Sequence, residues 1–233
     1  VTGSVGKTTT KDLPRQIFAS QGPTVAPQAS FNNEIGLPLT ILEADNDTRY
    51  LLLEMGASGP GHIAYLPDIA PLDVAAVLMV GHAHMGGFGS VEAVARAKSE
   101  IIQGLRSSGV AILNADDPRT MAMAELAPGP VFSFSPSGEP ANVRADDVVI
   151  GPDGRASFTA RTAGASAPVQ LQLGGADNVA NALAALTSAL GVGIALQAAR
   201  QVLSEEEALS PHRREGLLKT ADAGEHLQGG HPG

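Results

Sequence analysis

The sequence predicts an α/β domain with a mostly parallel sheet, helices on both faces, and a small antiparallel β patch. Three apolar runs without polar alternation, at 49–54 (RYLLLE), 73–80 (DVAAVLMV) and 110–114 (VAILN), are typical of strands buried on both faces of a parallel sheet. Between the second and third runs, residues 90–106 carry apolar side chains at helical spacing. Strand, helix and strand in this order indicate a doubly wound sheet.

The first element is a glycine-rich turn that begins directly after Val1 and Thr2. We therefore expect most of the strand that precedes such a turn to be missing. A helix is expected at about 8–20, with a kink or an early end at Pro14, because proline inside a helix costs about 3 kcal/mol.

The later elements follow from similar patterns. Ser90 is expected to cap the helix at 90–106, with Glu92 in its first turn. Short β-like pieces separated by Pro, Gly and Ser occupy 131–173 and predict the antiparallel patch. An alanine-rich helix is expected at 176–190. We expect residues 1–203 to form one domain and 204–233 to be a linker-like, loosely ordered tail, because the tail has few apolar residues.

The composition excludes several classes of function. With 233 residues, 43% of them hydrophobic, the chain can bury a large core, and no apolar run approaches the roughly 20 residues that cross a bilayer. A net charge of -9 gives no basic face for nucleic acid. The absence of cysteine removes disulfides and thiol chemistry, and no export leader is evident, so a cytoplasmic location without membrane insertion is expected. A phosphate-bearing ligand would have to be held locally.

The segment Gly3-Ser4-Val5-Gly6-Lys7-Thr8 matches the second half of a phosphate-binding loop. Glycines let the chain curl around phosphate oxygens, Lys7 can reach the β- and γ-phosphates, and the Thr8 hydroxyl can bind magnesium. The strict signature has a further glycine where this chain has Val1. The alternative is a Gly/Ser turn before a helix with an exposed lysine, and we favour the phosphate loop.

Lys98 stands on the apolar stripe of its helix, in line with Val91, Val94, Ile101 and Leu105. A buried ammonium without a partner is costly. Two interpretations are equally open: the side chain extends to water or pairs with an acid, or the amine reacts with carbon dioxide and becomes a carbamate that binds a hard cation.

Two further polar residues are expected at the same edge of the sheet. Glu54 ends the first buried strand and His84 follows the second, so both lie at the carboxyl edge that presents the phosphate loop. Singly, each is as readily a structural residue as a metal ligand. Together with Thr8 and Lys98 they favour a magnesium site beside a nucleoside triphosphate. Spacing alone does not choose between His82 and His84.

A family resemblance rests on seven motifs: TGSVGKTTTKD, FNNEIGLPLT, LLLEMGA, AHMGGFGS, AKSEI, LNADDPR and NVANALAAL. In this order they resemble the central ATP-binding domain of the Mur ligases, up to about residue 203. They are most similar to the members that add D-alanyl-D-alanine to UDP-N-acetylmuramoyl-tripeptide. The resemblance implies an ATP- and magnesium-dependent amide ligase of peptidoglycan precursor synthesis that works through an acyl phosphate.

The resemblance also implies roles for individual residues. Lys7 would act on the transferred phosphate, and carbamylated Lys98 would hold a second magnesium. The implied ATP contacts are Gly3, Ser4, Val5, Gly6, Lys7, Thr8 and Thr9 in the loop and Asn178 and Asn181 by the adenine; the implied substrate contacts are Asn32 and Asn33; the implied metal ligands are Thr8, Glu54, His84 and Lys98. Without the motifs, the four asparagines would be interpreted as turn and cap residues.

The chain also departs from the family pattern. We expect the domain that binds the UDP-sugar and the domain that binds the dipeptide to be absent, while residues from 211 begin like the linker to the latter. Two alternatives therefore remain: another Mur or folylpolyglutamate-type ligase, or a nucleotide-binding fragment that does not complete the reaction.

Overall fold

The computed structural model describes residues 1–4, 6–27, 31–33, 35–57, 59, 61–81 and 88–205, with only the backbone of Thr8 and Leu66. The helices are α1 (Lys7–Ala19), α2 (Gly36–Leu42), α3 (Tyr65–Ile69), α5 (Val91–Gln103), α6 (Pro118–Met121), the 3₁₀ helix η1 (Ala122–Leu126), α7 (Asn178–Gly191) and α8 (Leu196–Ser204). The strands are β1 (Thr24–Val25), β2 (Tyr50–Leu51), β3 (Leu72–Val77), β4 (Leu105–Asn114), β5 (Val131–Ser135), β6 (Val143–Ile150), β7 (Arg155–Arg161) and β8 (Ser166–Gly174).

The main sheet contains β3 to β8 in sequence order. The pairs β3–β4, β4–β5 and β5–β6 are parallel, and β6–β7 and β7–β8 are antiparallel. The predicted fold class is confirmed. Antiparallel pairing begins later than expected, at Val143 rather than 131, and it continues the same sheet. The crossover through α6 and η1 returns the chain so that β5 runs parallel to β4, which short β-like sequence pieces do not indicate.

Val1 and Thr2 occupy a strand position between the two sheets. The Val1 amine donates to the Leu53 carbonyl at 2.7 Å. On the other side, the Thr2 amide donates to the Ala76 carbonyl at 2.9 Å, and the Leu78 amide donates to the Thr2 carbonyl at 3.0 Å. The two-stranded parallel sheet β1–β2 is thereby linked to the main sheet, and the glycine-rich turn follows a strand end, as predicted.

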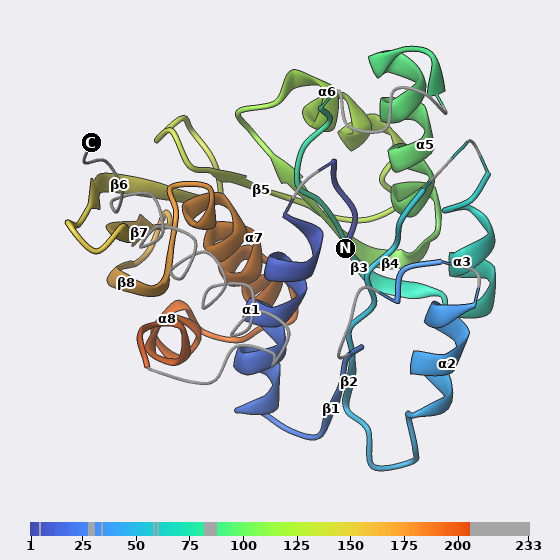
Figure 1. Cartoon of the computed structure of the whole chain (residues 1–233), viewed down its shortest axis with the longest axis horizontal. Helices are drawn as coiled ribbons and strands as arrows, with labels where there is room; N and C mark the ends of the chain where they lie inside the picture. Colours follow the sequence, from blue (N-terminus) through green and yellow to red (C-terminus); the bar gives the residue numbers. More distant parts are fainter. Residues whose placement is uncertain are drawn as a thin grey trace, which may run out of the picture.

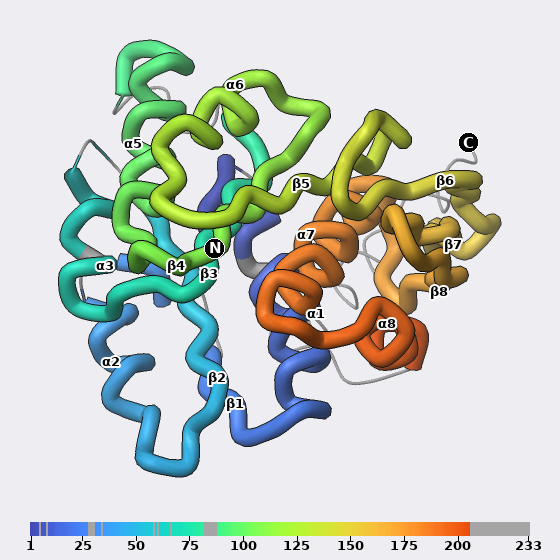
Figure 2. Tube along the Cα trace, turned by 180° about the vertical axis from the view of Figure 1, so that it is seen from behind, coloured from blue at the N-terminus to red at the C-terminus, as the bar shows by residue number. Residues whose placement is uncertain are grey.

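The side chains of β3 alternate between two cores. Ala76 and Leu78 pack into the cluster under α1, α7 and α8, while Ala75 and Val77 pack into the cluster under α2 and α5. Figure 1 shows these two groups of helices on opposite sides of β3 and β4, and the reverse view in Figure 2 shows the same division. The apolar run at 73–80 is therefore buried on both faces, as its composition predicts.

The helix after the glycine-rich turn is α1, and it continues through Pro14 to Ala19. The expectation of an early end is wrong. Proline removes one helical hydrogen bond at a cost of about 3 kcal/mol. Against this, Leu13 and Ile17 are buried beneath α1, and each such side chain contributes about 1.5–3 kcal/mol. Packing therefore outweighs the local penalty.

The helix expected at 90–106 is α5, but it ends at Gln103, and Leu105, expected on its apolar stripe, begins β4. The predicted cap of α5 is confirmed: the Ser90 hydroxyl accepts a hydrogen bond from the Ala93 amide at 3.2 Å. The alanine-rich helix is α7, and its residues 178–191 fall close to the predicted 176–190. No helix in the described part of the chain is long and apolar enough to cross a membrane. The tail beyond 205 lies outside the described residues.

Candidate functional site

The glycine-rich turn lies at the carboxyl edge of the parallel strands. The Ser4 amide donates to the Met79 carbonyl at 3.1 Å. The Ser4 hydroxyl accepts from the Gly81 amide at 2.8 Å and donates to the Gly81 carbonyl at 3.2 Å. Ser4 therefore fixes the turn to the segment that follows β3. Among the predicted loop residues, Thr9 is buried and Val5 lies outside the described residues.

Gly6 and Lys7 give the turn its shape. Gly6 has φ of 81° in the left-handed region and caps α1, which begins at Lys7. The Lys7 ammonium donates to the Gly3 carbonyl at 3.0 Å, so the side chain folds back over the turn. Amide groups at the start of a helix have no partners within it and attract anions. The turn, the helix start and the ammonium therefore form a phosphate-loop geometry.

The two asparagines of α7 form a relay behind this turn. The Asn178 amide group donates to the Gly174 carbonyl at 2.7 Å, and the Asn181 amide group donates to the Asn178 side-chain oxygen at 2.9 Å. The Asn181 oxygen in turn accepts from the Thr10 hydroxyl at 2.9 Å. A Cβ placed on Gly6 would lie 2.5 Å from that oxygen. The relay therefore ties β8 to the phosphate loop, a contact that the sequence did not indicate.

The strand expected at 49–54 is shorter than predicted: β2 covers only Tyr50–Leu51, and Glu54 lies beyond it in the segment that follows. Glu54 is almost completely buried, and its Oε1 accepts from the Asn32 amide group at 2.7 Å. The Asn32 carbonyl accepts from the Gly56 amide at 2.8 Å. The side-chain oxygen of Asn33 accepts from the amide of Gly36, the first residue of α2, at 2.8 Å. Asn32 therefore contacts Glu54, whereas Asn33 bonds the start of α2.

Lys98 is buried on α5, as its place on the apolar stripe predicts. Burial, and next the charge of Lys7, lower the pKa of the Lys98 ammonium to about 8. Lys7 therefore lies within electrostatic range of Lys98. No ion pair joins Lys98 to an acid within the described ranges. His82 and His84, the candidate histidines, lie outside them.

Glu100 is a site-supporting residue that the sequence interpretation did not single out. Its carboxylate accepts from the amides of Gly61, Ile63 and Ala64 at 2.7, 3.1 and 2.9 Å. These amides belong to the segment that continues from Glu54. Glu100 therefore fixes that segment to the helix that carries Lys98. The motif AKSEI contains both residues, but only the three-dimensional contact separates their roles.

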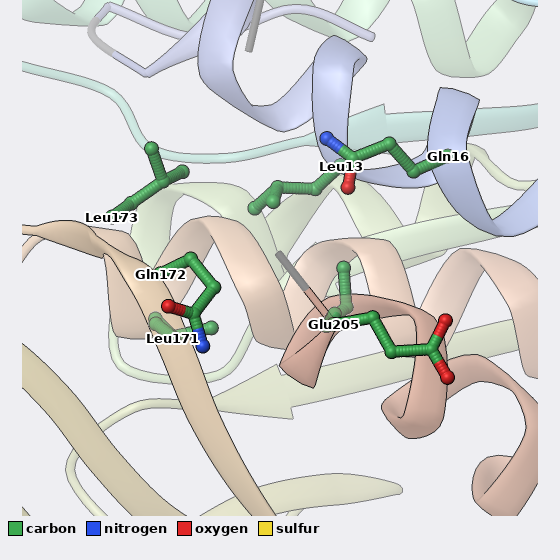
Figure 3. Close-up of a pocket in the computed structure, with 7 residues that line it drawn as sticks. Leu13, Gln16, Leu171, Gln172, Leu173 and Glu205 are labelled. Carbon is green, nitrogen blue, oxygen red and sulfur yellow. The ribbon is translucent and has the colours of Figure 1, made fainter. Parts of the chain in front are cut away.

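A small hollow lies along α1 away from the phosphate loop (Figure 3). It is lined by Leu13, Gln16, Leu171, Gln172, Leu173, Leu203 and Glu205. Its walls come from α1, β8 and the end of α8, and most of them are apolar. None of the predicted site residues lines it, so the candidate site is defined by the loop at the sheet edge.

A parallel sheet with a glycine turn, a helix start and a lysine at its carboxyl edge defines an α/β domain of the phosphate-loop class. The profile of the Mur ligase middle domain matches residues 1–189. The chain belongs to this family.

Two curated relatives of this chain carry the same name. The chain is 43% identical over 213 residues to the UDP-N-acetylmuramoyl-tripeptide–D-alanyl-D-alanine ligase of Mycobacterium tuberculosis, covering 91% of this chain and 42% of the relative. The Escherichia coli ligase of the same name is 35% identical over 210 residues, covering 90% and 46%. The chain thus spans less than half the length of these relatives.

Solved structures show the same similarity. MurF from Acinetobacter baumannii superimposes with a TM-score of 0.84 at 35% identity, covering 89% of this chain and 45% of that one. MurF ligase from Thermotoga maritima in complex with ADP has a TM-score of 0.79 at 30% identity, covering 90% and 48%.

Proposed function

We propose that this domain binds ATP at the phosphate loop and serves a ligase that adds D-alanyl-D-alanine to UDP-N-acetylmuramoyl-tripeptide. The observation that carries the proposal is the Lys7 ammonium, held over the loop by the Gly3 carbonyl at the start of α1. The names of the relatives and the ADP bound to the Thermotoga maritima enzyme support it.

The proposed reaction has two steps. An oxygen of the tripeptide carboxylate attacks the γ-phosphorus of ATP, the bond to the β-phosphate oxygen breaks, and an acyl phosphate and ADP result. The dipeptide amine then attacks the acyl carbon, and the tetrahedral intermediate expels phosphate while the amine nitrogen loses a proton. Lys7 and the amides at the start of α1 stabilise the charge on the transferred group.

Glu54 fits a magnesium ion, because a buried carboxylate at the loop edge is the hard oxygen ligand that this cation prefers. Thr8, in the first turn of α1, would be its second protein ligand. When bound, magnesium neutralises charge on the phosphate oxygens. The described residues contain no cluster of three acids or histidines, so such an ion would depend on ligand oxygens and water as well.

Lys98 fits a metal only after modification, since an ammonium repels a cation. We assign it as a carbamate, formed when its neutral amine attacks carbon dioxide and releases a proton. The pKa of about 8 supports this assignment, because the neutral amine is then accessible near physiological pH. His84 would be the further ligand of the second magnesium. Labelled bicarbonate should give a carbamate carbon signal in the NMR spectrum that Lys98→Ala removes, and a signal that persists in the variant would refute the assignment.

The proposal also assigns ligand contacts to four asparagines. Asn178 and Asn181, at the start of α7 beside the loop, would flank the adenine, and each retains unused hydrogen-bonding capacity beyond the relay. Asn32 and Asn33 would face the nucleotide-sugar substrate from the other side of Glu54.

The test is calorimetric titration of ATP and ADP with magnesium. Lys7→Ala should weaken binding severely, because it removes the cation that reaches the phosphates. Arg106→Ala is a matched control. Arg106 is an exposed cation that pairs with Asp73, and it lies near the start of β4, at the end of that strand opposite to the phosphate loop. Equal binding by the Lys7 variant and the wild type would remove the site from this loop.

We also expect the isolated chain to show no ligase turnover. The chain spans less than half of its relatives, and bringing reactants together supplies much of the rate of such a reaction. Product formed by the purified chain from ATP and both substrates would contradict this.

A further inference from the structure

Lys11, on the second turn of α1, is a buried cation to which the proposed chemistry assigns no role. Its side chain has no exposed surface. The Lys11 ammonium donates to the Pro27 carbonyl and lies 3.2 Å from Oδ1 of Asp12. Among the described residues, the other oxygen of Asp12, Oδ2, is buried without a hydrogen-bond partner.

Stability does not account for this pair. Two buried charges lose their hydration, and apolar residues of similar volume in their place are often equally stable or more so. Leu13 and Ile17 show that α1 packs well with apolar side chains. The unsatisfied oxygen of Asp12 adds a further cost. What an apolar residue cannot supply is the hydrogen bond that fixes the Pro27 carbonyl.

Pro27 precedes in the sequence the two asparagines that are proposed to face the substrate. A few residues further on, Asn32 holds both Glu54 and the Gly56 amide, at 2.7 and 2.8 Å. The side-chain oxygen of Asn33 accepts from the Gly36 amide at the start of α2. Pro27 is thus held by the phosphate-loop helix, and Asn32 is held by the carboxylate beside the loop.

We propose that Lys11 is a positioning residue that fixes Pro27 to α1 and so sets Asn32, further along the chain, against Glu54. The expected effect of Lys11 on nucleotide binding rests on the proposed function, whereas its expected effect on the position of Asn32 does not. Lys7 and Lys11 stand one helical turn apart, so a phosphate group that fixes the start of α1 also fixes Lys11 and, through Pro27, the substrate side.

The first test measures amide hydrogen exchange by NMR in the chain without nucleotide. Lys11→Met combined with Asp12→Asn removes both charges and leaves no buried ion unpaired. The Gly56 and Gly36 amides should then exchange at least about tenfold faster, a change of about 1.4 kcal/mol in local opening. The Val94 amide, which bonds Ser90 at the start of α5, should be unchanged. Unchanged exchange at Gly56 and Gly36, or an equal rise at Val94, would overturn the proposal.

Two further variants isolate the role of the ammonium. Arg15→Met makes the same kind of change one turn further along α1 and should leave the Gly36 and Gly56 amides protected. If the double variant folds poorly, Lys11→Arg is the deciding variant. The longer, planar guanidinium displaces the Pro27 carbonyl and should speed hydrogen exchange at the Gly36 and Gly56 amides. Unchanged exchange at these amides would refute the positioning role of Lys11.

The second test separates this inference from the proposed function. In calorimetry, the double variant should bind ADP without magnesium within about twofold of the wild type, and magnesium should improve that binding less than in the wild type. A wild type that binds no ADP refutes the proposed function, while the exchange result still decides whether Lys11 positions Asn32. Equal improvement by magnesium in both proteins refutes the coupling of Lys11 to the site.

Discussion

A single methyl group on Gly6 tests the contact between the phosphate loop and α7. Gly6 has φ of 81°, and an added Cβ would lie 2.5 Å from the Asn181 oxygen that accepts from Thr10. Real Cβ contacts are essentially never this short, so Asn181 must move. Gly6→Ala should therefore strain the backbone and also break a buried hydrogen bond.

The expected loss of stability is the sum of these two effects. A left-handed conformation costs a non-glycine residue about 1–2 kcal/mol, and leaving buried polar groups without partners costs about 1–3 kcal/mol. The free energy of unfolding should then fall by about 2–5 kcal/mol. Gly154 is the matched control, because it has φ of 76° with no atom within 4 Å of an added Cβ. Gly154→Ala should cost only about 1–2 kcal/mol.

Urea unfolding of four proteins measures the coupling: wild type, Gly6→Ala, Asn181→Ala and the double variant. Asn181→Ala removes the oxygen that the added Cβ would approach. The loss of stability in the double variant should therefore be smaller than the sum of the two single losses, by about 1–3 kcal/mol. If Gly6→Ala costs no more than Gly154→Ala, and the two losses simply add, the relay does not constrain the loop.

Three other variants test features of α5. Ser90→Ala should lower the free energy of unfolding by about 1 kcal/mol through loss of the cap, whereas exposed Ser107→Ala should change it little; equal losses in thermal unfolding would refute the cap. Glu100→Gln should cost about 1–3 kcal/mol, because an amide has one acceptor oxygen for three backbone donors, and Glu125→Gln should be neutral. Burial and the charge of Lys7 lower the pKa of Lys98 from 10.5 to about 8. Between pH 8 and about 10.5 the unfolded state therefore binds more protons than the folded state, and the contribution of Lys98 to the free energy of unfolding rises with pH. Without magnesium and bicarbonate, Lys98→Met should therefore be more stable than the wild type below pH 8, and urea unfolding should show this difference shrinking between pH 8 and 10.5; a difference independent of pH would refute the pKa shift.

The sequence predicts what depends on local pattern. The run at 73–80, the Ser90 cap and the buried place of Lys98 follow from periodicity and capping chemistry, and each is present in the structure. The sequence marks the glycine-rich turn because glycine readily adopts positive φ, and Gly6 does so in the structure, with φ of 81°.

Contacts between distant parts of the chain could not be predicted in this way. The pairing of β5 with β4 depends on the path of the crossover between them. The continuity of α1 through Pro14 depends on packing against α7 and α8. Lys11 and Glu100 are ordinary charged residues in the sequence, and their partners at Pro27 and Gly61 come from other elements. No periodicity marks such pairs.

The charges at the carboxyl edge link the proposed ligands of the site to one another. Lys7 and Lys98 are near enough for the charge of one to lower the pKa of the other, so the site without ligand contains an unfavourable repulsion. In the proposed function, an anionic phosphate near these amines would offset this repulsion, and we expect its relief to contribute to the affinity for nucleotide. Carbamate formation at Lys98 removes the same repulsion by a different route, but it places an anion close to the triphosphate. A cation is then required between the two anions, and for this reason the proposed modification of Lys98 and the proposed magnesium ions depend on each other.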